Sequence, residues 1–212
     1  MAERLLHIKA SPRGSLSRSA MVASRLLARL QETDVEPLDL FDADLPPFGG
    51  AVIEGRYALL SGQPVAEDAA ADWQRIEGMV AHFLSFDTWL FSTPMWNFGI
   101  PYRLKHYIDL LTQPGLAFSA DAGGNVIGHA VGRTAIIIAA GALDTRPESA
   151  LGSLDHQAAY LEAWLSFLGA TNIHVIRVMP TFGEAAVVDR AMETAYAEAD
   201  ALARRLSRPS RV

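Results

Sequence analysis

The chain has 212 residues, of which 50% are hydrophobic and 20% charged, with a formal net charge of −6 and no cysteine. This length and composition predict one globular domain over residues 1–212, and the negative charge argues against nucleic acid or an anionic membrane as the main partner. The missing cysteines exclude disulfides, thiolate catalysis and cysteine-ligated metals, and the lack of a signal-peptide layout or a long apolar run favours a cytoplasmic location.

A hydroxyl-rich loop, residues 11–19 (the serine loop), separates the first predicted strand from a helix predicted over 19–31. Strand, loop and helix in this order are the layout of a phosphate cradle, because N–H groups at a helix N-terminus attract an anion. Four side chains add hydroxyl groups or positive charge to it: Ser11, Ser17, Arg18 and Ser19. The loop has neither a dinucleotide nor an NTP glycine motif, so a terminal monophosphate suits it better. The alternative is that one of these serines only caps the helix.

The next 50 or so residues are less regular. Residues 35–40 are predicted to form a strand that Pro37 confines to a sheet edge, because proline has no N–H to donate. Residues 51–64 are predicted to be an irregular segment and a candidate lid, with Tyr57 as a candidate substrate contact. A helix is predicted over 67–85, where apolar residues recur at three- and four-residue spacing.

An aromatic stretch dominates the middle of the chain. Residues 86–92 are typical of a strand buried on both faces, and 102–111 of an amphipathic helix. The loop between them, residues 93–101 (the aromatic loop), is apolar where a surface loop is ordinarily polar. Open α/β sheets bind ligands at such strand ends, and aromatic rings with backbone N–H groups suit a flat heteroaromatic ligand. Packing in a core or at a subunit interface explains the loop equally well from composition alone.

The aromatic loop, Thr-Pro-Met-Trp-Asn-Phe-Gly-Ile-Pro, resembles the flavin loop of the FMN-dependent NADH-azoreductases, a family of flavodoxin-like quinone reductases. That family usually has tyrosine where this chain has Trp96. The serine loop is similar to the phosphate loop of the same family, which often has glutamine at the place of Arg18. The resemblance implies FMN as cofactor and the following residues as its contacts: Ser11, Ser17, Arg18, Ser19, Pro94, Met95, Trp96, Asn97 and Phe98.

Three later segments extend the resemblance. Residues 113–128 read as a hairpin around a Gly-Gly-Asn turn, and the family has a similar excursion near its flavin, which makes Phe118 a candidate substrate contact. Residues 134–140 read as a buried parallel strand; the family's Ser-x-Gly-Gly after it is Ala-Ala-Gly-Ala here, so only Gly141 remains as a flavin contact. Family members dimerise through a helix like that predicted over 153–168, which makes Phe167 a second candidate substrate contact.

Strands and helices alternate five times, the last pair being a strand at 173–178 and a helix at 184–206. This alternation predicts an α/β protein, a flavodoxin-like doubly wound sheet of five parallel strands in the order 2-1-3-4-5 with a small hairpin excursion. In that order the first and third strands are neighbours. The serine loop and the aromatic loop should therefore meet in one crevice at the carboxyl ends of the strands.

No catalytic triad, carboxylate pair or metal-ligand cluster is visible in the sequence. A flavoenzyme needs none of these, because its cofactor performs the redox chemistry. The resemblance implies a cytoplasmic homodimer that reduces FMN with NADH and then passes two electrons to a quinone or an azo compound, in a ping-pong reaction with the site at the dimer interface. Two alternatives are a flavodoxin-type electron carrier without substrate turnover, and a flavodoxin-like domain with another ligand or a regulatory role.

Overall fold

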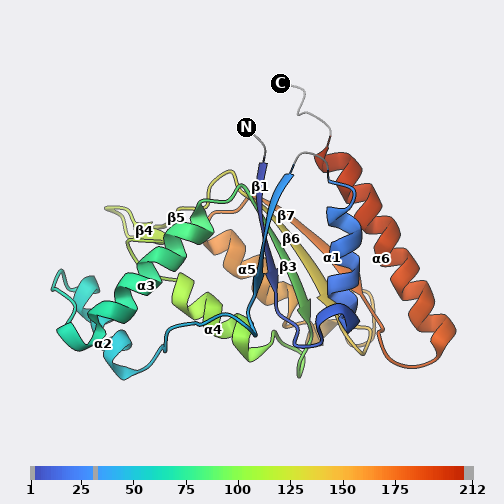
Figure 1. The fold of residues 1–212 in the computed structure, drawn as a ribbon, viewed down its shortest axis with the longest axis horizontal. Helices are drawn as coiled ribbons and strands as arrows, with labels where there is room; N and C mark the ends of the chain where they lie inside the picture. Colours follow the sequence, from blue (N-terminus) through green and yellow to red (C-terminus); the bar gives the residue numbers. More distant parts are fainter. Residues whose placement is uncertain (1–2, 31–32, 208–212) are drawn as a thin grey trace.

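The structure, a computed structural model, describes residues 3–30 and 33–207. Five parallel strands form one sheet in the order β2-β1-β3-β6-β7, which confirms the predicted flavodoxin-like topology (Figure 1). Their bounds are Glu3–Lys9 (β1), Thr33–Asp39 (β2), Thr88–Pro94 (β3), Thr134–Ala140 (β6) and Asn172–Val178 (β7). The predicted hairpin is also present, as a separate antiparallel pair of Phe118–Ala120 (β4) and Val126–Gly128 (β5).

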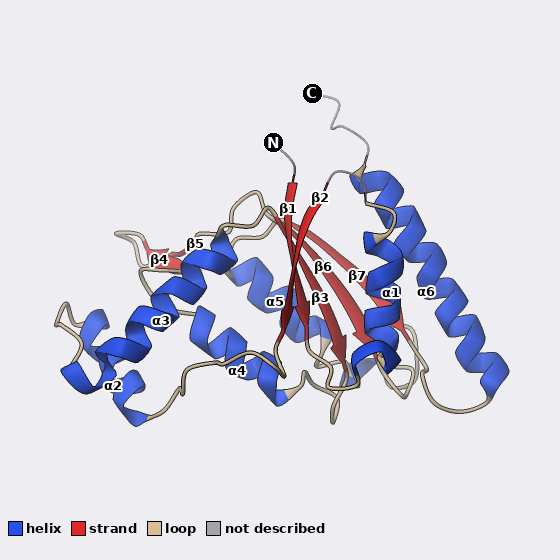
Figure 2. Ribbon diagram, in the orientation of Figure 1, coloured by secondary structure: helices blue, strands red, loops and turns tan. Residues whose placement is uncertain are grey.

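Helices cover both faces of the sheet (Figure 2). One face carries Arg18–Leu27 (α1) and Ala185–Leu206 (α6); the other carries Glu67–Leu84 (α3), Tyr102–Leu111 (α4) and Ala158–Phe167 (α5). Gly50–Leu60 (α2) packs on α3, and two short 3₁₀ helices span Gly14–Leu16 and Gly152–Leu154. Each face has its own apolar core. The central strands β3 and β6 lie between the two cores and are buried along nearly their whole length, as expected for parallel strands with helices on both faces.

Several predicted boundaries were wrong. Residues 51–64 are not irregular, because α2 occupies most of the segment. This helix was missed because it has no apolar stripe; it is held by Gly55, which lies directly against the ring of Trp73, and by the bond from Trp73 Nε1 to Val52 O at 3.1 Å. The first helix ends at Leu27, earlier than predicted, and the predicted end at residue 31 lies outside the described residues.

Two further elements begin later than predicted. The third strand starts at Thr88, because Phe86 and Asp87 still belong to the turn after α3. The helix predicted from residue 153 begins at Ala158, because a 3₁₀ turn and an acidic cap precede it. Among residues 3–30 and 33–207, no helix is both long and apolar enough to cross a membrane.

Candidate functional site

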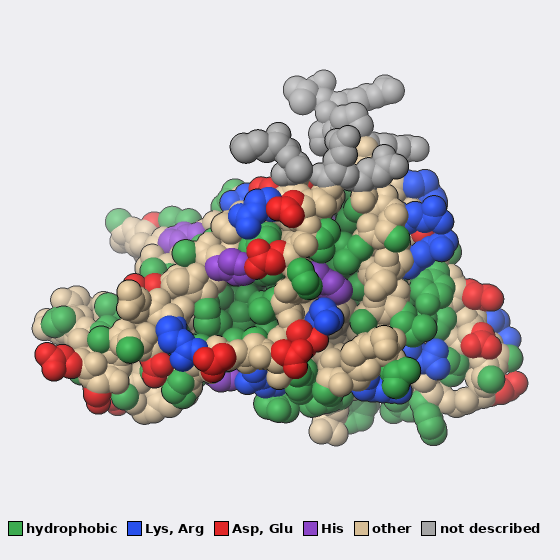
Figure 3. Space-filling view, in the orientation of Figure 1, with side chains coloured by type: hydrophobic (Ala, Val, Ile, Leu, Met, Phe, Trp, Pro, Cys, Tyr) green, Lys and Arg blue, Asp and Glu red, His purple; other side chains and the backbone are tan. Residues whose placement is uncertain are grey.

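The loops that follow β1, β3 and β6 come together at one edge of the sheet. The N–H of Ala10 donates to Ser92 O at 3.0 Å, which joins the start of the serine loop to β3. The N–H of Met95 donates to Ala140 O at 2.6 Å, which joins the aromatic loop to the end of β6. The serine loop and the aromatic loop therefore follow neighbouring strands, β1 and β3, as predicted, and Figure 3 shows apolar side chains along this lower edge of the molecule.

The serine loop has both features that the sequence left as alternatives. Ser17 caps α1, since its Oγ accepts from the N–H of Ala20 at 3.4 Å and lies 3.1 Å from Ser19 Oγ. Ser11, Ser17 and Ser19 are all buried. No acceptor among the described residues takes the N–H groups of Arg18 and Ser19, as is usual for the first turn of a helix. Capping thus leaves donors free for an anion at this end of α1.

The aromatic loop closes in a tight two-residue turn. Trp96 and Gly99 exchange backbone hydrogen bonds of 2.9 and 3.0 Å, and the two residues between them have positive φ, 48° at Asn97 and 69° at Phe98. Such a turn requires positive φ at both central positions. Asparagine tolerates it, but a bulky residue such as phenylalanine is held there at a cost of about 1–3 kcal/mol. Among the described residues nothing accepts the N–H groups of Asn97 and Phe98, so both remain donors at the tip.

Trp96 lies in an aromatic cluster that was missed by the sequence analysis. Its ring centroid is 6.0 Å from that of Phe41, which follows β2, and 6.2 Å from that of Tyr102 at the start of α4. Arg103 of α4 fixes this arrangement, because its guanidinium donates to Leu40 O at 2.6 Å and also to Ala43 O, both in the loop after β2. The indole is therefore turned toward the end of β2, and the Phe98 ring, 39% exposed, is left at the tip of the loop.

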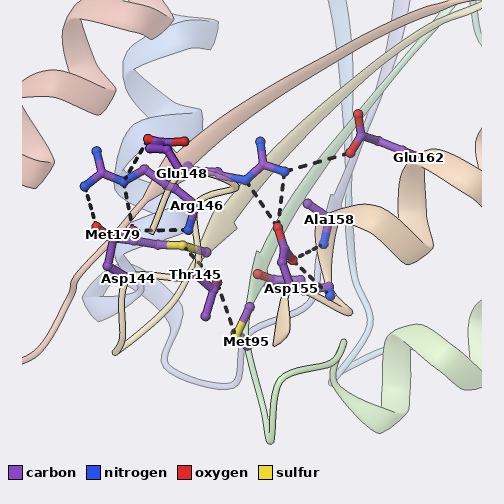
Figure 4. A network of polar contacts seen from close by, with 11 residues as sticks. Met95, Asp144, Thr145, Arg146, Glu148, Asp155, Ala158, Glu162 and Met179 are labelled. Carbon is purple, nitrogen blue, oxygen red and sulfur yellow. Dashed lines mark hydrogen bonds and ion pairs between the residues drawn. The ribbon is translucent and has the colours of Figure 1, made fainter. Parts of the chain in front are cut away.

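Sulfur and hydroxyl groups support the aromatic loop from the β6 side (Figure 4). Thr145 Oγ1 lies 3.4 Å from Met179 Sδ and 4.0 Å from Met95 Sδ. Gly141 forms part of the same wall: its N–H donates to Val178 O at 3.1 Å and its carbonyl accepts from Thr181 N at 2.8 Å. Its backbone is therefore engaged, and a Cβ there would lie 3.1 Å from Met179 Cε. A side chain at position 141 would therefore require Met179 to shift by a few tenths of an ångström.

The loop that follows β6 also contains an ion pair. Arg146 Nε and Nη2 donate to the two carboxylate oxygens of Asp144 at 2.8 and 2.5 Å, and Glu148 lies 3.8 Å from Nε. The hydrogen bonds from Arg146 lower the pKa of Asp144 below its ordinary value. Beside this pair a cavity of about 360 Å³ runs between the loop, the edge of β7 and one side of α6. Met179 lines this cavity, but none of the predicted site residues does.

His7 lies under the crevice, on β1. Its Nε2 is 2.9 Å from Ser92 Oγ, and the side chain is 6% exposed. Burial lowers the pKa of His7 to about 4; the charge of Lys9 adds to this effect and that of Asp39 opposes it. The imidazole is therefore neutral at physiological pH. Among the described residues, no three His, Asp or Glu side chains are grouped so that they could hold a metal ion.

Phe118 and Phe167 contact each other but not the aromatic loop of their own chain. Their ring centroids are 4.9 Å apart at an interplanar angle of 62°. They lie at the C-terminal end of α5, whereas the N–H of His156, just before the other end, donates to Phe98 O at 3.0 Å. A ten-residue helix spans about 15 Å, so this distance separates the aromatic pair from the crevice. Tyr57 is 61% exposed on α2, at the far left of Figure 1.

A doubly wound sheet of this strand order, with the serine loop and the aromatic loop at the point where the order reverses, is typical of the flavodoxin-like class of proteins. Comparison with known proteins agrees, since the family model with a flavodoxin-like fold matches residues 3–203.

Relatives in sequence narrow the class. The chain is 40% identical over 207 residues to an FMN-dependent NADH:quinone oxidoreductase of Desulfotalea psychrophila, covering 96% of this chain and 97% of the relative. It is 37% identical over 203 residues to FMN-dependent NADH:quinone oxidoreductase 2 of Pseudomonas syringae pv. tomato, covering 94% and 97%. The chain therefore belongs to the family of FMN-dependent NADH:quinone oxidoreductases.

Solved structures support the fold. An azoreductase from Bacillus anthracis str. Sterne superposes with a TM-score of 0.86 at 24% identity, covering 96% of this chain and 99% of the other. An FMN-dependent NADH-azoreductase from Bacillus anthracis str. Ames Ancestor, solved in complex with FMN, gives a TM-score of 0.85 at 23% identity, covering 97% and 100%. At these identities the likeness concerns the fold, and the sequence relatives carry the family assignment.

Proposed function

We propose that the chain forms one FMN-binding domain, residues 1–212, which oxidises NADH and reduces quinones or azo compounds. One observation carries the proposal: the serine loop, with free helix N–H groups, and the strained aromatic turn lie at the ends of neighbouring strands. The first suits a terminal phosphate and the second a flat heteroaromatic ring. The names of the sequence relatives supply the same cofactor and the same type of reaction.

The proposed contacts follow from where the groups lie. Ser11, Ser17 and Ser19 offer hydroxyl groups to the phosphate, and Arg18 adds charge at the start of α1. Five residues of the aromatic loop are proposed to contact the ring system: Pro94, Met95, Trp96, Asn97 and Phe98. The N–H of Gly141 already donates to Val178 O, so it is not proposed to bond the flavin. Gly141 is proposed to contact the flavin only through its backbone surface, on the β6 side of the site.

FMN supplies the hydride and electron chemistry when it is bound. The chain's own residues bind it, orient it and exclude water from it. In this proposal the N–H groups of Asn97 and Phe98, which have no acceptor among the described residues, stabilise negative charge at the edge of the ring. The arrangement needs no acid or base of its own, and the buried neutral His7 is not assigned a catalytic role.

We further propose a cytoplasmic homodimer in which each crevice is completed by the partner. Phe118, which is half-buried, and Phe167 pair at the end of α5 that lies away from the aromatic loop of their own chain, so in this proposal they reach the substrate of a second copy. Phe167 is 39% exposed, and Tyr57 also faces solvent. These three side chains are the proposed substrate contacts, and in a dimer they would cover the ring face that the aromatic loop leaves open.

An absorption spectrum tests the proposal. The purified protein, loaded with FMN, is expected to show flavin bands that bleach when NADH is added without oxygen and return when a quinone is added. Bands that bleach with NADH but do not return with a quinone or an azo dye would favour an electron carrier of flavodoxin type. A protein that cannot be loaded with FMN would refute the assignment and leave the aromatic loop as packing.

A further inference from the structure

The turn at the tip of the aromatic loop has to be held in place. Two consecutive residues, Asn97 and Phe98, have positive φ, and only the paired bonds between Trp96 and Gly99 fix the turn from within. Neither central residue is glycine, which adopts such angles without strain. A turn of this kind persists only where its surroundings over-determine it, so contacts from outside the loop are required.

Those contacts come from the residues that lead into α5. The N–H of His156 donates to Phe98 O at 3.0 Å, which fixes the carbonyl at the strained tip. Gln157 Nε2 donates to Thr93 O at 3.1 Å, where the loop leaves β3, and Gln157 is fully buried. Adjacent residues of one segment thus hold both the start and the tip of the loop.

The segment is itself fixed to β7. Asp155 Oδ1 accepts from the N–H groups of Gln157 at 3.2 Å and Ala158 at 2.9 Å, which caps the start of α5 (Figure 4). Asp155 Oδ2 accepts from Arg177 Nε at 3.3 Å and Nη2 at 3.2 Å. Asp155 is 8% exposed, so the carboxylate is largely shielded from water and its pairing with the β7 guanidinium is well defined.

The chemistry of Gln157 indicates a purpose beyond filling space. Its Oε1 is buried and has no partner among the described residues, which is unfavourable for an amide. An apolar side chain of the same size would avoid this cost and would also fill the space. What the amide adds is the bond to Thr93 O, at the base of the aromatic loop.

We propose that Arg177, Asp155 and Gln157 are positioning residues that hold the aromatic loop in its ligand-ready conformation. The Asp155–Arg177 ion pair fixes the segment that leads into α5. Gln157 and the N–H of His156 in that segment then bond Thr93 O and Phe98 O. The inference rests on the proposed function, because this loop is the one proposed to hold FMN. It adds one residue of β7, Arg177, and two residues that precede α5, Asp155 and Gln157, none of which is a proposed FMN contact.

Gln157→Met tests the proposal, with Gln113→Met as a matched control. Both glutamines are fully buried, both donate Nε2 to backbone carbonyls, and both have an unpartnered Oε1 among the described residues. Gln113 bonds the end of α4 instead of the aromatic loop. Each variant is measured for its FMN dissociation constant by quenching of flavin fluorescence, for amide hydrogen exchange of residues 95–99 in the apoprotein, and for its unfolding free energy.

Gln157→Met is expected to raise the FMN dissociation constant about five- to tenfold and to speed exchange of the Trp96 and Gly99 amides, whose bonds close the turn. Gln113→Met should change the dissociation constant by less than about twofold. Equal FMN affinity and equal exchange in the two variants would overturn the proposal, whatever their stabilities.

Two further outcomes are also decisive. If Gln157→Met does not fold, Asp155→Asn takes its place: the amide oxygen keeps the cap and loses the charge that pairs with Arg177, and the same two readouts apply. If the wild-type protein itself does not bind FMN, the proposed function fails. The exchange of the apoprotein amides then decides the positioning role alone, because it requires no flavin.

Discussion

Acid should destabilise this protein through one buried side chain, His7. The pKa falls from 6.5 to about 4 on folding because burial disfavours the imidazolium. Above about pH 7 the ring is neutral in both states and costs nothing. As the pH drops below 6.5, the unfolded chain binds a proton that the folded chain cannot, so the free energy of unfolding decreases. At about 1.4 kcal/mol per pKa unit, the loss reaches about 2 kcal/mol near pH 5 and about 3 kcal/mol at pH 4, and it levels off at about 3.5 kcal/mol at lower pH.

Urea unfolding at a series of pH values measures this loss, and His7→Gln is the variant to compare. Glutamine can keep a bond to Ser92 Oγ but does not titrate, so its stability should fall less steeply between about pH 7 and pH 5. Gln113→Met, which removes no ionisable group, serves as the control and should keep the wild-type slope. An NMR titration that finds the His7 ring charging near 6.5, or equal slopes in the wild type and His7→Gln, would refute the reasoning.

Three further predictions concern the loops. Asn97→Gly should keep the turn but weaken FMN binding about five- to tenfold, whereas Asn97→Leu should add about 1–3 kcal/mol of backbone strain; fluorescence titration and urea unfolding separate the two effects, and unchanged affinity in Asn97→Gly would remove the amide from the site. Replacing Ser17 and Ser19 by Asp should abolish FMN retention by repelling the phosphate, and a variant that still purifies with normal flavin content would contradict the cradle. Gly128→Ala should cost about 1–3 kcal/mol or more, because its Cβ would lie 2.0 Å from Leu168 C; a wild-type melting curve would count against the close approach of the hairpin to the end of α5.

The strand order, and with it the placement of the serine and aromatic loops after neighbouring strands, was predictable from sequence because it depends on local patterns. Buried apolar runs such as 134–140 mark parallel strands, and a right-handed doubly wound sheet leaves few ways to order five of them. The placement of the two loops then follows from the neighbouring positions of β1 and β3. Only the helix α2 was wrong in kind, since it is held by contacts with Trp73 of α3 and has no periodic pattern of its own.

The supports of the site were not predictable, because they join residues far apart in the chain. Gln157 and Thr93 are 64 positions apart, and the rings of Phe41 and Trp96 come from loops after different strands. An acidic residue shortly before an apolar helix is a capping signal, and Asp155 carries it, but the pattern does not reveal its pairing with Arg177. The positive φ of Phe98 has no sequence signal at all, because phenylalanine is unusual at such a position.

The long connection between β1 and β3 also determines when the crevice can form during folding. Their register pairs Leu5 with Thr88, 83 positions later, with β2, α2 and α3 in between. Non-local pairings of this kind are made slowly, because the loop-closure entropy is lost before the contacts form. The crevice therefore does not exist until the sheet has closed, and FMN has nothing to bind before that step. The cofactor should slow unfolding of the finished protein and leave its folding rate unchanged.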